Sequence, residues 1–504
     1  MYSQLLSIFL SVILLITLFY FYYKFYLTRV SKKSSIVHTL APGPRPYPVI
    51  GNLACFRECD TPFRVFTNLS KVYGDIYSLQ MGTTPCIVVN SFELIKEILI
   101  VQGSLFGGRP DFIRYHRIFG NDRNNSLALC DWSSLQEKRR RIARKYCSPR
   151  IISSNYQLMS KISLIETPIL LKAIHKRILS GNKSVKIKPL LQSAFSNMFT
   201  QYLCSTRFDY EDKQLQTMVR NFDEIFYEIN QGHPVDFLPW LNPFFSKHMN
   251  KIAGWANEIR EIMLERIIKQ HLDTVDYDDH PRDFTDALLQ YFREDEELSW
   301  DHIMFDLEDF IGGHAALGNL VMLILIYLMK NPHCIDKIRQ EIDAVTGGLR
   351  DVCMDDKYKM PYTEALVFET LRICASPIVP HVATEDTTVA GYSVCKGTVV
   401  ILNNFDLNTS DLYWDEPTKF KPERFISQDG IVVKPSHFIP FGTGKRTCIG
   451  QKLVTDFTFI VITSILNHYD VSYPNMDELK LVPACVALPA ETYELEFTLR
   501  KDLF

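Results

Sequence analysis

Residues 441–450 read FGTGKRTCIG, and this glycine-rich stretch around a single cysteine decides the fold. Gly442 and Gly444 can adopt backbone conformations that are closed to other residues, which turns N–H groups inward. Such donors, together with the positive charge of Arg446, favour the deprotonated form of Cys448. The alternative without a functional site is a glycine-rich turn around a buried, inert cysteine. The full pattern F-G-x-G-x-R-x-C-x-G is too specific for that alternative, and it indicates a thiolate that binds a metal.

The bulk composition is that of a folded protein with a large core. The chain has 504 residues, of which 46% are hydrophobic and 22% charged. Its formal net charge of -3 is close to balance, so we expect no nucleic-acid partner. The 12 cysteines are scattered without a CxxC pair, which argues against a disulfide scaffold and a structural zinc site. We expect most of these cysteines to be buried, reduced and inert.

The N-terminal segment predicts a membrane anchor. Residues 5–23 carry no charge, and about 20 apolar residues are what a helix needs to cross a bilayer. A signal peptide would begin with basic residues and have a shorter apolar core, and a mitochondrial presequence would be amphipathic and Arg-rich. By the positive-inside tendency the body stays in the cytosol, because the run is followed directly by Lys24, Arg29, Lys32 and Lys33.

Three segments are predicted along the chain. Residues 1–26 form the membrane anchor, as one transmembrane helix. Residues 27–52 form a basic and Pro-rich hinge, because proline fixes φ and lacks a backbone donor. Residues 53–504 form one body, the catalytic domain, in which we find no internal repeat and no obvious boundary.

Hydrophobic periodicity predicts a body that is mainly α with a small β portion. Apolar residues recur at helical spacing over residues 255–272 and again over residues 303–329. The second run is broken by two glycines and carries three acids, which argues against a second membrane span. Residues 76–89 and 390–403 instead predict short strands joined by glycine turns.

The stretch around Cys448 resembles the haem-binding loop of the cytochrome P450 superfamily, and companion motifs occur in the family's order. Glu369 and Arg372 resemble its helical ExxR, where two residues three apart share one helix face. Arg424, within the PERF of residues 422–425, resembles the arginine that joins the pair in a structural charge cluster. The resemblance implies the cytochrome P450 fold, with Cys448 as the axial ligand to the iron of haem b. In that family the thiolate favours O–O cleavage.

The resemblance extends along nearly the whole chain. Residues 42–44 (PGP) and 106–110 (FGGRP) also match the hinge and an early loop of the family.

Further residues are expected to contact the haem. Phe441 can pack on the proximal ring face, and Gly450 lets the following helix approach the macrocycle. Arg446 supplies positive charge where a propionate would lie. His381 matches a position where the family often places a propionate contact, although a lone histidine could equally be a satisfied structural residue. Trp132 resembles the family's helical tryptophan, which contacts a propionate.

The second contact on the segment after this tryptophan is open. The family places an arginine four residues later, where this chain has Gln136, and arginines come only at Arg139, Arg140 and Arg141. Arg139 is our first candidate. We expect the basic run of residues 138–145 to line the proximal side of the haem and to dock an acidic electron donor, an NADPH-cytochrome reductase.

The glycine-broken helix departs from the family's A/G-G-x-D/E-T pattern. Residues 312–316 read GGHAA, so alanines replace the acid and the alcohol that help to deliver protons. His314 lies about 200° around the helix from Ala316, so it faces away if Ala316 faces the haem, and we favour a structural role for it. Asn319 lies one turn beyond Ala316 and could hold a water. A substrate hydroxyl could also complete the relay.

Residues 309–316 and 130–136 are similar to the arthropod spook-type members of this family. Those members act early in making ecdysteroid moulting hormones from dietary sterol. The similarity implies a monooxygenase of the endoplasmic reticulum membrane that oxidises a sterol or ecdysteroid precursor, with electrons from NADPH through the reductase. A steroid is compatible with the apolar pocket expected from Phe305, Ile378, Val379 and Ala487.

Two alternatives stay open. The missing acid and alcohol would suit a haem-thiolate isomerase or dehydratase that needs no oxygen. The same fold could also serve a non-enzymatic protein that binds haem or sterol.

Overall fold

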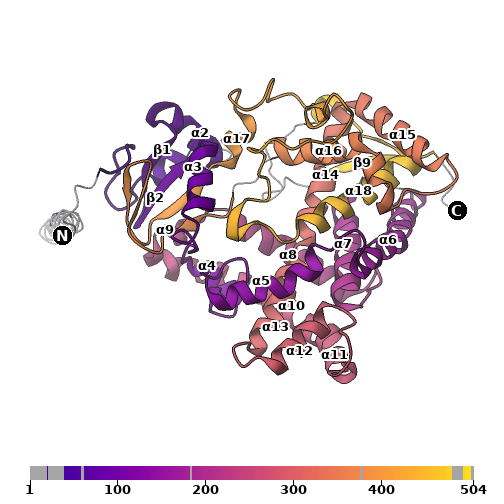
Figure 1. Cartoon of the computed structure of the whole chain (residues 1–504), viewed down its shortest axis with the longest axis horizontal. Helices are drawn as coiled ribbons and strands as arrows, with labels where there is room; N and C mark the ends of the chain where they lie inside the picture. Colours follow the sequence, from indigo (N-terminus) through magenta and orange to yellow (C-terminus); the bar gives the residue numbers. More distant parts are fainter. Residues whose placement is uncertain are drawn as a thin grey trace, which may run out of the picture.

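The computed structural model describes Thr17, Tyr20 and residues 39–57, 62–181, 184–374, 378–479 and 492–500. Apart from Thr17 and Tyr20, which are helical, the predicted transmembrane helix lies outside the described residues, and so does the predicted pocket residue Ala487. Helices make up most of the molecule, and a small sheet lies at one end (Figure 1). The prediction of a mainly α body with a small β portion is confirmed.

The helices follow one another through most of the chain. They are α2 (Pro62–Tyr73), α3 (Phe92–Lys96), α4 (Ile113–Ile118), α5 (Ser134–Cys147), α6 (Ser154–Leu179), α7 (Ile187–Cys204), α8 (Lys213–Asn230), α9 (Pro234–Phe237), α10 (Ser246–Met263), α11 (Lys269–Thr274), α12 (Phe284–Glu294), α13 (Trp300–Gly312), α14 (His314–Lys330), α15 (Pro332–Thr346), α16 (Pro361–Ile373), α17 (Asn404–Thr409) and α18 (Gln451–His468).

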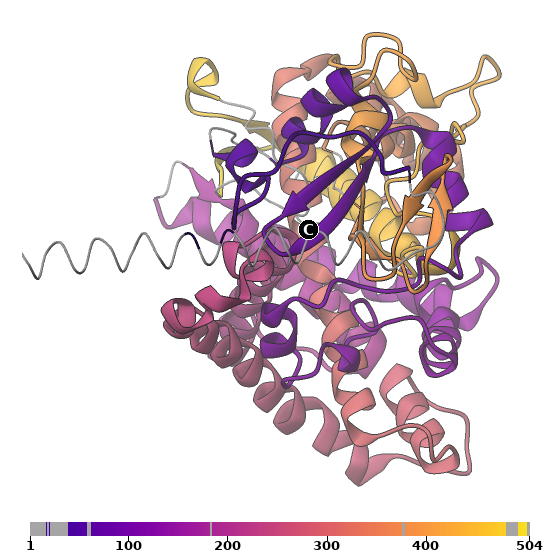
Figure 2. The same ribbon diagram turned by 90° about the vertical axis from the view of Figure 1, so that its left-hand side faces the viewer.

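The main sheet has the order β1-β2-β7-β4, formed by β1 (Ile76–Met81), β2 (Thr84–Val89), β7 (Val399–Leu402) and β4 (His381–Val382). β1 and β2 form an antiparallel hairpin that turns at Gly82, whose φ of 56° favours glycine. β2 pairs with β7 in parallel, and β4 pairs with β7 antiparallel, which sets His381 opposite Val400. Figure 2 shows the hairpin in front of the helices. The strands predicted over residues 76–89 and 390–403 are confirmed.

Two smaller sheets complete the strands. β3 (Val185–Lys186), β9 (Glu494–Leu499) and β8 (Tyr469–Ser472) form one, and β5 (Thr387–Val389) pairs with β6 (Tyr392–Val394) in the other.

The centre of the molecule is the long helix formed by α13 and α14. It is interrupted at Gly313, where the predicted glycine break lies. Within the described residues, Trp300–Lys330 alone is long and apolar enough to cross a membrane, but 78% of its most apolar window is buried inside the protein. α14 packs against α7, α16 and α18, so it is a core helix, as the sequence predicts.

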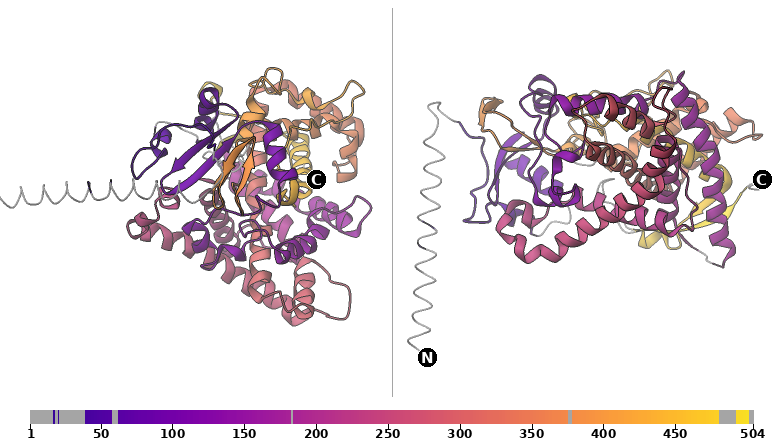
Figure 3. Two further views of the ribbon diagram at one scale, coloured as in Figure 1. Left: turned by 60° about the vertical axis from the view of Figure 1, so that its left-hand side comes forward. Right: turned by 90° about the horizontal axis from the view of Figure 1, so that it is seen from below.

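The helix predicted over residues 255–272 is also present. α10 runs through a single π-helical turn, Leu264–Ile268, into α11. Seen from below, α10 crosses one face of the molecule (Figure 3). It packs on α8, α4 and α13.

Candidate active site

The cysteine loop takes its shape from two glycines with left-handed backbones. φ is 70° at Gly442 and 72° at Gly444. A Cβ added to Gly444 would lie 2.1 Å from the carbonyl oxygen of Leu99, so no other residue fits there. The N–H of Cys448 donates to the carbonyl of Phe441 at 2.9 Å and closes the loop. The special backbone conformations predicted for Gly442 and Gly444 are therefore present, and Phe441 lies directly beside the cysteine.

Cys448 holds its sulfur at the start of α18. The backbone N–H groups of Gly450 and Gln451 donate to the thiol, and Arg140 adds positive charge nearby. Burial outweighs these effects and raises the pKa of Cys448. Because a coordinating metal deprotonates a thiol outright, the donors would stabilise the resulting thiolate. A Cβ on Gly450 would lie 3.8 Å from the sulfur, in ordinary van der Waals contact with it.

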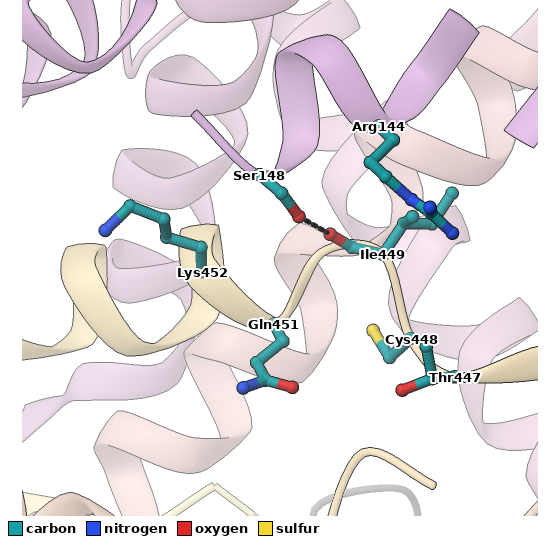
Figure 4. A pocket seen from close by; sticks show the side chains of 7 residues that line it. All are labelled: Arg144, Ser148, Thr447, Cys448, Ile449, Gln451 and Lys452. Carbon is teal, nitrogen blue, oxygen red and sulfur yellow. Dashed lines mark hydrogen bonds between the residues drawn. The ribbon is translucent and has the colours of Figure 1, made fainter. Parts of the chain in front are cut away.

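The side chain of Cys448 is exposed although the residue lies deep in the protein. It therefore faces a space inside the molecule. Cys448 also lines an open cavity of about 270 Å³ between α5 and α18 (Figure 4). The cavity is lined by Arg144, Ser148, Thr447, Cys448, Ile449, Gln451 and Lys452.

Next to the cysteine loop, buried nitrogen atoms converge without a partner. Arg446 donates from Nη2 to the carbonyls of Gly107 and Cys130 at 2.5 Å each, but its Nε and Nη1 have no hydrogen-bond partner in the described part of the protein. Nδ1 of His381 lies 2.7 Å from the carbonyl oxygen of Phe106. Its buried Nε2 also has no hydrogen-bond partner in the described part of the protein.

Two more arginines belong to this cluster. Arg109 donates from Nη1 to the carbonyls of Val379 and Pro380, at 2.8 and 3.0 Å. Arg140 donates from Nη2 to the carbonyl of Thr447 in the cysteine loop, and its buried Nε has no partner among the described residues. We name Arg109, Arg140, Arg446 and His381 the cationic cluster.

The electrostatics of the cationic cluster call for an anion. Burial and repulsion by Arg446 lower the pKa of Arg109 to about 9, and burial lowers the pKa of Arg446 to about 10. Burial also lowers the pKa of Arg140. These shifts arise because cations are gathered in a buried place; Asp131 partly offsets the charge of Arg446, but none of the three arginines forms an ion pair with a described carboxylate. The two propionates of a haem, beside a cysteine ligand, fit these residues.

The tautomer of His381 determines the protonation state in which it could bind an anion. Because Nδ1 lies against a carbonyl oxygen it must carry the proton, so the neutral ring offers only a lone pair at Nε2. Burial, with repulsion by Arg109, lowers the pKa of His381 well below its usual value. An anion at Nε2 would oppose this shift, and His381 would bind it as the protonated ring.

Arg139, our first candidate for the second contact, is engaged elsewhere. Its Nη2 lies 2.6 Å from Asp306 of α13, and it also donates to the carbonyl of Asn125 at 2.6 Å. Both partners of the ion pair are 2% exposed, so Arg139 has no free side to offer a cofactor. Arg140, the next residue, faces the cysteine loop and replaces Arg139 as our candidate.

The resemblance implied that Trp132 lies on a helix. The structure instead places it two residues before the start of α5. Lys445 and Arg446 lie over its ring, 5.5 and 5.7 Å from the centroid. A Cβ on Gly107 would meet Trp132 at 2.6 Å, so the early FGGRP loop must pass close to the indole. Arg109 was not predicted from the sequence, although its position next to two glycines in this loop was an available signal.

The three predicted structural residues meet in the core. Oε2 of Glu369 lies 2.7 Å from Nε of Arg372 and 3.0 Å from Nε of Arg424. Arg372 also donates to the carbonyls of Asn408 and Pro417, at 2.6 and 2.8 Å. The cluster therefore fastens the segment before the cysteine loop to α16.

The candidate proton-relay residues separate in the structure. Ala316 is partly exposed, whereas His314 and Asn319 are fully buried. The ring of His314 stands edge-on to Phe222 of α8, 5.4 Å between centroids, and Nδ1 contacts the carbonyl of Ile311 at 2.6 Å. Burial lowers the pKa of His314 to about 4. This placement favours the structural role expected from the helix angle.

Comparison with known proteins gives matches along most of the chain. A family model described as Cytochrome P450 matches residues 41–497. Cytochrome P450 307a1 of Drosophila melanogaster is 48% identical over 500 residues, covering 94% of this chain and 92% of its own length. Farnesoate epoxidase of Bombyx mori is 28% identical, covering 91% and 94%. Cytochrome P450 1A1 of Canis lupus familiaris is 28% identical, covering 88% and 86%.

Proposed function

This chain belongs to the cytochrome P450 family of haem monooxygenases, and from that premise we propose that it oxidises a sterol or ecdysteroid precursor early in moulting-hormone biosynthesis. The observation that carries the substrate proposal is the similarity of residues 309–316 and 130–136 to the arthropod spook-type members. Its support is the 48% identity with an insect relative over most of both chains.

The residues of the site divide the work of holding haem b. Cys448 would ligate the iron, and the N–H groups of Gly450 and Gln451 would stabilise the charge on its sulfur. Arg109, Arg140, Arg446 and His381 would hold the propionates, and Trp132 and Phe441 would cover neighbouring edges. When bound through the thiolate, haem supplies the reductive activation of oxygen.

Proton delivery on the distal side differs from the family pattern. Ala315 and Ala316 have no group that can hold or pass a proton. His314 is turned toward α8, and Asn319 is buried. We propose that ordered water or a hydroxyl of the substrate completes the relay next to Ala316.

The electrons would come from NADPH through a cytochrome reductase. Exposed Arg144 lines the cavity beside Cys448, Arg141 and Lys145 are exposed on the same helix, and Lys445 is exposed in the cysteine loop. An acidic donor would be steered to such a face by charge, and its association rate would fall as salt rises. The anchor of residues 1–26 would hold the enzyme on the endoplasmic reticulum with the catalytic domain in the cytosol.

A panel of sterols incubated with the protein, its reductase and NADPH, read by mass spectrometry, tests this function. We expect an oxidised sterol with consumption of oxygen and NADPH. Conversion of a substrate without oxygen or electrons would favour the isomerase or dehydratase. That alternative is motivated by the two alanines that replace the acid and the alcohol of the family pattern. Haem and sterol binding without any conversion would favour the non-enzymatic protein.

A further inference from the structure

One face of the central helix is partly exposed, whereas the rest of the helix is buried; we call it the open face. From residue 303 to residue 326, only Asp309, Gly312, Gly313 and Ala316 are not buried. These four follow the i, i+3, i+4, i+7 spacing, so they share one face of the helix. Cys448 is likewise exposed deep inside the protein. Partial exposure of one face in an otherwise buried helix is what a wall of the space beside Cys448 would show.

Asp309 puts a carboxylate into this otherwise apolar wall. Its Oδ2 accepts the N–H groups of Leu127 at 2.6 Å and Ala128 at 3.3 Å. Among the described residues, the donor to Oδ1 is the hydroxyl of Ser126 at 3.1 Å, which Oδ1 shares with Oδ2 at 3.0 Å. A carboxylate oxygen has room for a further donor, so Oδ1 can still accept one from the internal space.

The neighbouring acids of the same helix, unlike Asp309, are held in ion pairs. Asp306 pairs with Arg139 at 2.6 Å, and Glu308 pairs with Arg260 of α10 at 3.0 Å. Asp309 forms no ion pair with any residue that the structure describes. Of these three neighbouring acids, two are therefore explained by ion pairs, and Asp309 is not.

The loop that caps Asp309 leads directly to the cationic cluster. The carbonyl of Ala128 accepts from Nε of Arg109 at 3.1 Å, and the carbonyl of Cys130 accepts from Arg446 at 2.5 Å. Ala128 itself is exposed. Asp309, Arg109 and Arg446 are therefore hydrogen-bonded to the same short loop of residues 127–130.

The spacing along the helix decides what Asp309 can do. Seven residues separate it from Ala316, a rise of about 10 Å at the usual pitch. General acid–base transfer needs a separation of about 3 Å, so Asp309 is too far from the reacting position to pass a proton directly. It is well placed to hold the opposite end of a rigid substrate.

We propose that Asp309 recognises a hydroxyl group at the far end of an otherwise apolar substrate, by accepting its O–H at Oδ1. The size of that substrate, a sterol, rests on the proposed function, whereas the preference for an alcohol does not. An alcohol donates to the carboxylate, but a ketone in the same place leaves two acceptors facing each other, an arrangement that costs binding free energy. Asp309 is thus a specificity-determining residue.

Matched alcohols and carbonyl compounds test the proposal: cholestanol against cholestanone, and farnesol against farnesal as a pair outside the sterols. Dissociation constants come from the spin-state shift of the holoprotein and, independently, from the ligand-induced rise in Tm. We expect at least one wild-type pair to show about tenfold preference for the alcohol, which corresponds to about 1.4 kcal/mol. Asp309→Asn should reduce this ratio to about one, since an amide oxygen can still cap the loop while its NH₂ group donates.

Glu308→Gln is the matched control, because it changes the adjacent acid without touching the open face, and it should keep the tenfold ratio. An unchanged ratio in Asp309→Asn, or no alcohol preference by the wild type in either pair, would overturn the proposal. An alcohol preference that Asp309→Asn removes, in a protein that oxidises no sterol, would support the role of Asp309 and refute the proposed function alone.

Discussion

Arg139 and Arg140 are neighbours on α5, yet their guanidinium groups bind different parts of the site. Arg139 points to Asp306 on the central helix, and Arg140 donates to the carbonyl of Thr447 beside Cys448. One helix thus ties the distal wall of the site to its sulfur loop. The pair also separates a residue that maintains the fold from a residue that we expect to bind the cofactor.

Substitution of each arginine should therefore have a different effect. Arg139→Gln leaves Asp306 buried without its partner, which typically costs about 3–5 kcal/mol of stability. Arg140→Gln should leave most of the stability intact and lower the ratio of haem to protein. Thermal unfolding and haem content, measured on both variants, check this. Equal loss of haem at equal stability in both would contradict the division of roles.

Cys448→Ala should remove the red-shifted Soret band of the reduced, carbon-monoxide-bound protein, together with all turnover. The reason is that no other thiol is held by this loop. Cys395→Ser, at an exposed cysteine away from the site, is the control and should keep both. The assignment of Cys448 would be wrong if the band persisted in the alanine variant.

Glu369→Ala should fail to accumulate as haem-loaded protein, because Arg372 and Arg424 would keep buried positive charge without a counter-ion. Glu423→Gln changes a surface ion pair with Lys337, and such pairs contribute about 0–1 kcal/mol. Yield and haem content should be nearly normal in this control. A stable, haem-loaded but inactive Glu369→Ala protein would point to a catalytic role instead.

His314→Ala should lower stability by about 1–3 kcal/mol, because it removes the ring that packs against Phe222. The coupling of NADPH use to product formation should not change, and peroxide release should stay at the wild-type level. Ala316→Thr places an alcohol on the open face and is the comparison variant. A large rise in peroxide from His314→Ala, at unchanged Tm and haem content, would make His314 the proton donor.

The stability should depend on pH through His271, which lies 2.9 Å from Asp283 and joins α11 to α12. Burial alone would lower the pKa of His271, but Asp283 outweighs it and the pKa is raised above 6.5. The protonated ring is therefore favoured in the folded state. Its contribution is fully present below pH 6.5 and is lost as the pH rises through the folded-state value. Denaturant unfolding across this range should show the loss in the wild type, and His271→Asn should flatten the curve.

Much of the site could be predicted because its residues are fixed by local chemistry. The left-handed glycines of the cysteine loop and the pairing of Glu369 with Arg372 follow from short spacings. The side of the helix on which His314 lies also followed from helix geometry alone. Long-range choices could not be derived in this way. Which arginine of three faces the sulfur depends on where α13 places Asp306, and nothing in the spacing of residues 139–141 contains that position.

The roles of Arg109 and Asp309 were missed for the same reason. Arg109 stands in a motif that was recognised, but its function depends on contacts with Val379 and Pro380, about 270 residues further along the chain. Asp309 reads as one acid of a polar helix face until the ion pairs of Asp306 and Glu308 set it apart.

The three arginines of the cationic cluster also bear on the life of the protein in the cell. Without a bound dianion they repel one another inside the folded body, so the cofactor-free chain carries a penalty that haem removes on binding. By mass action, the folded fraction then rises with the free haem concentration. Proteases act on the unfolded fraction, so a cell short of haem would contain less of this protein and not a reserve of inactive enzyme. Its half-life after haem depletion, compared in wild type and Arg109→Gln, measures how far cofactor supply sets its abundance.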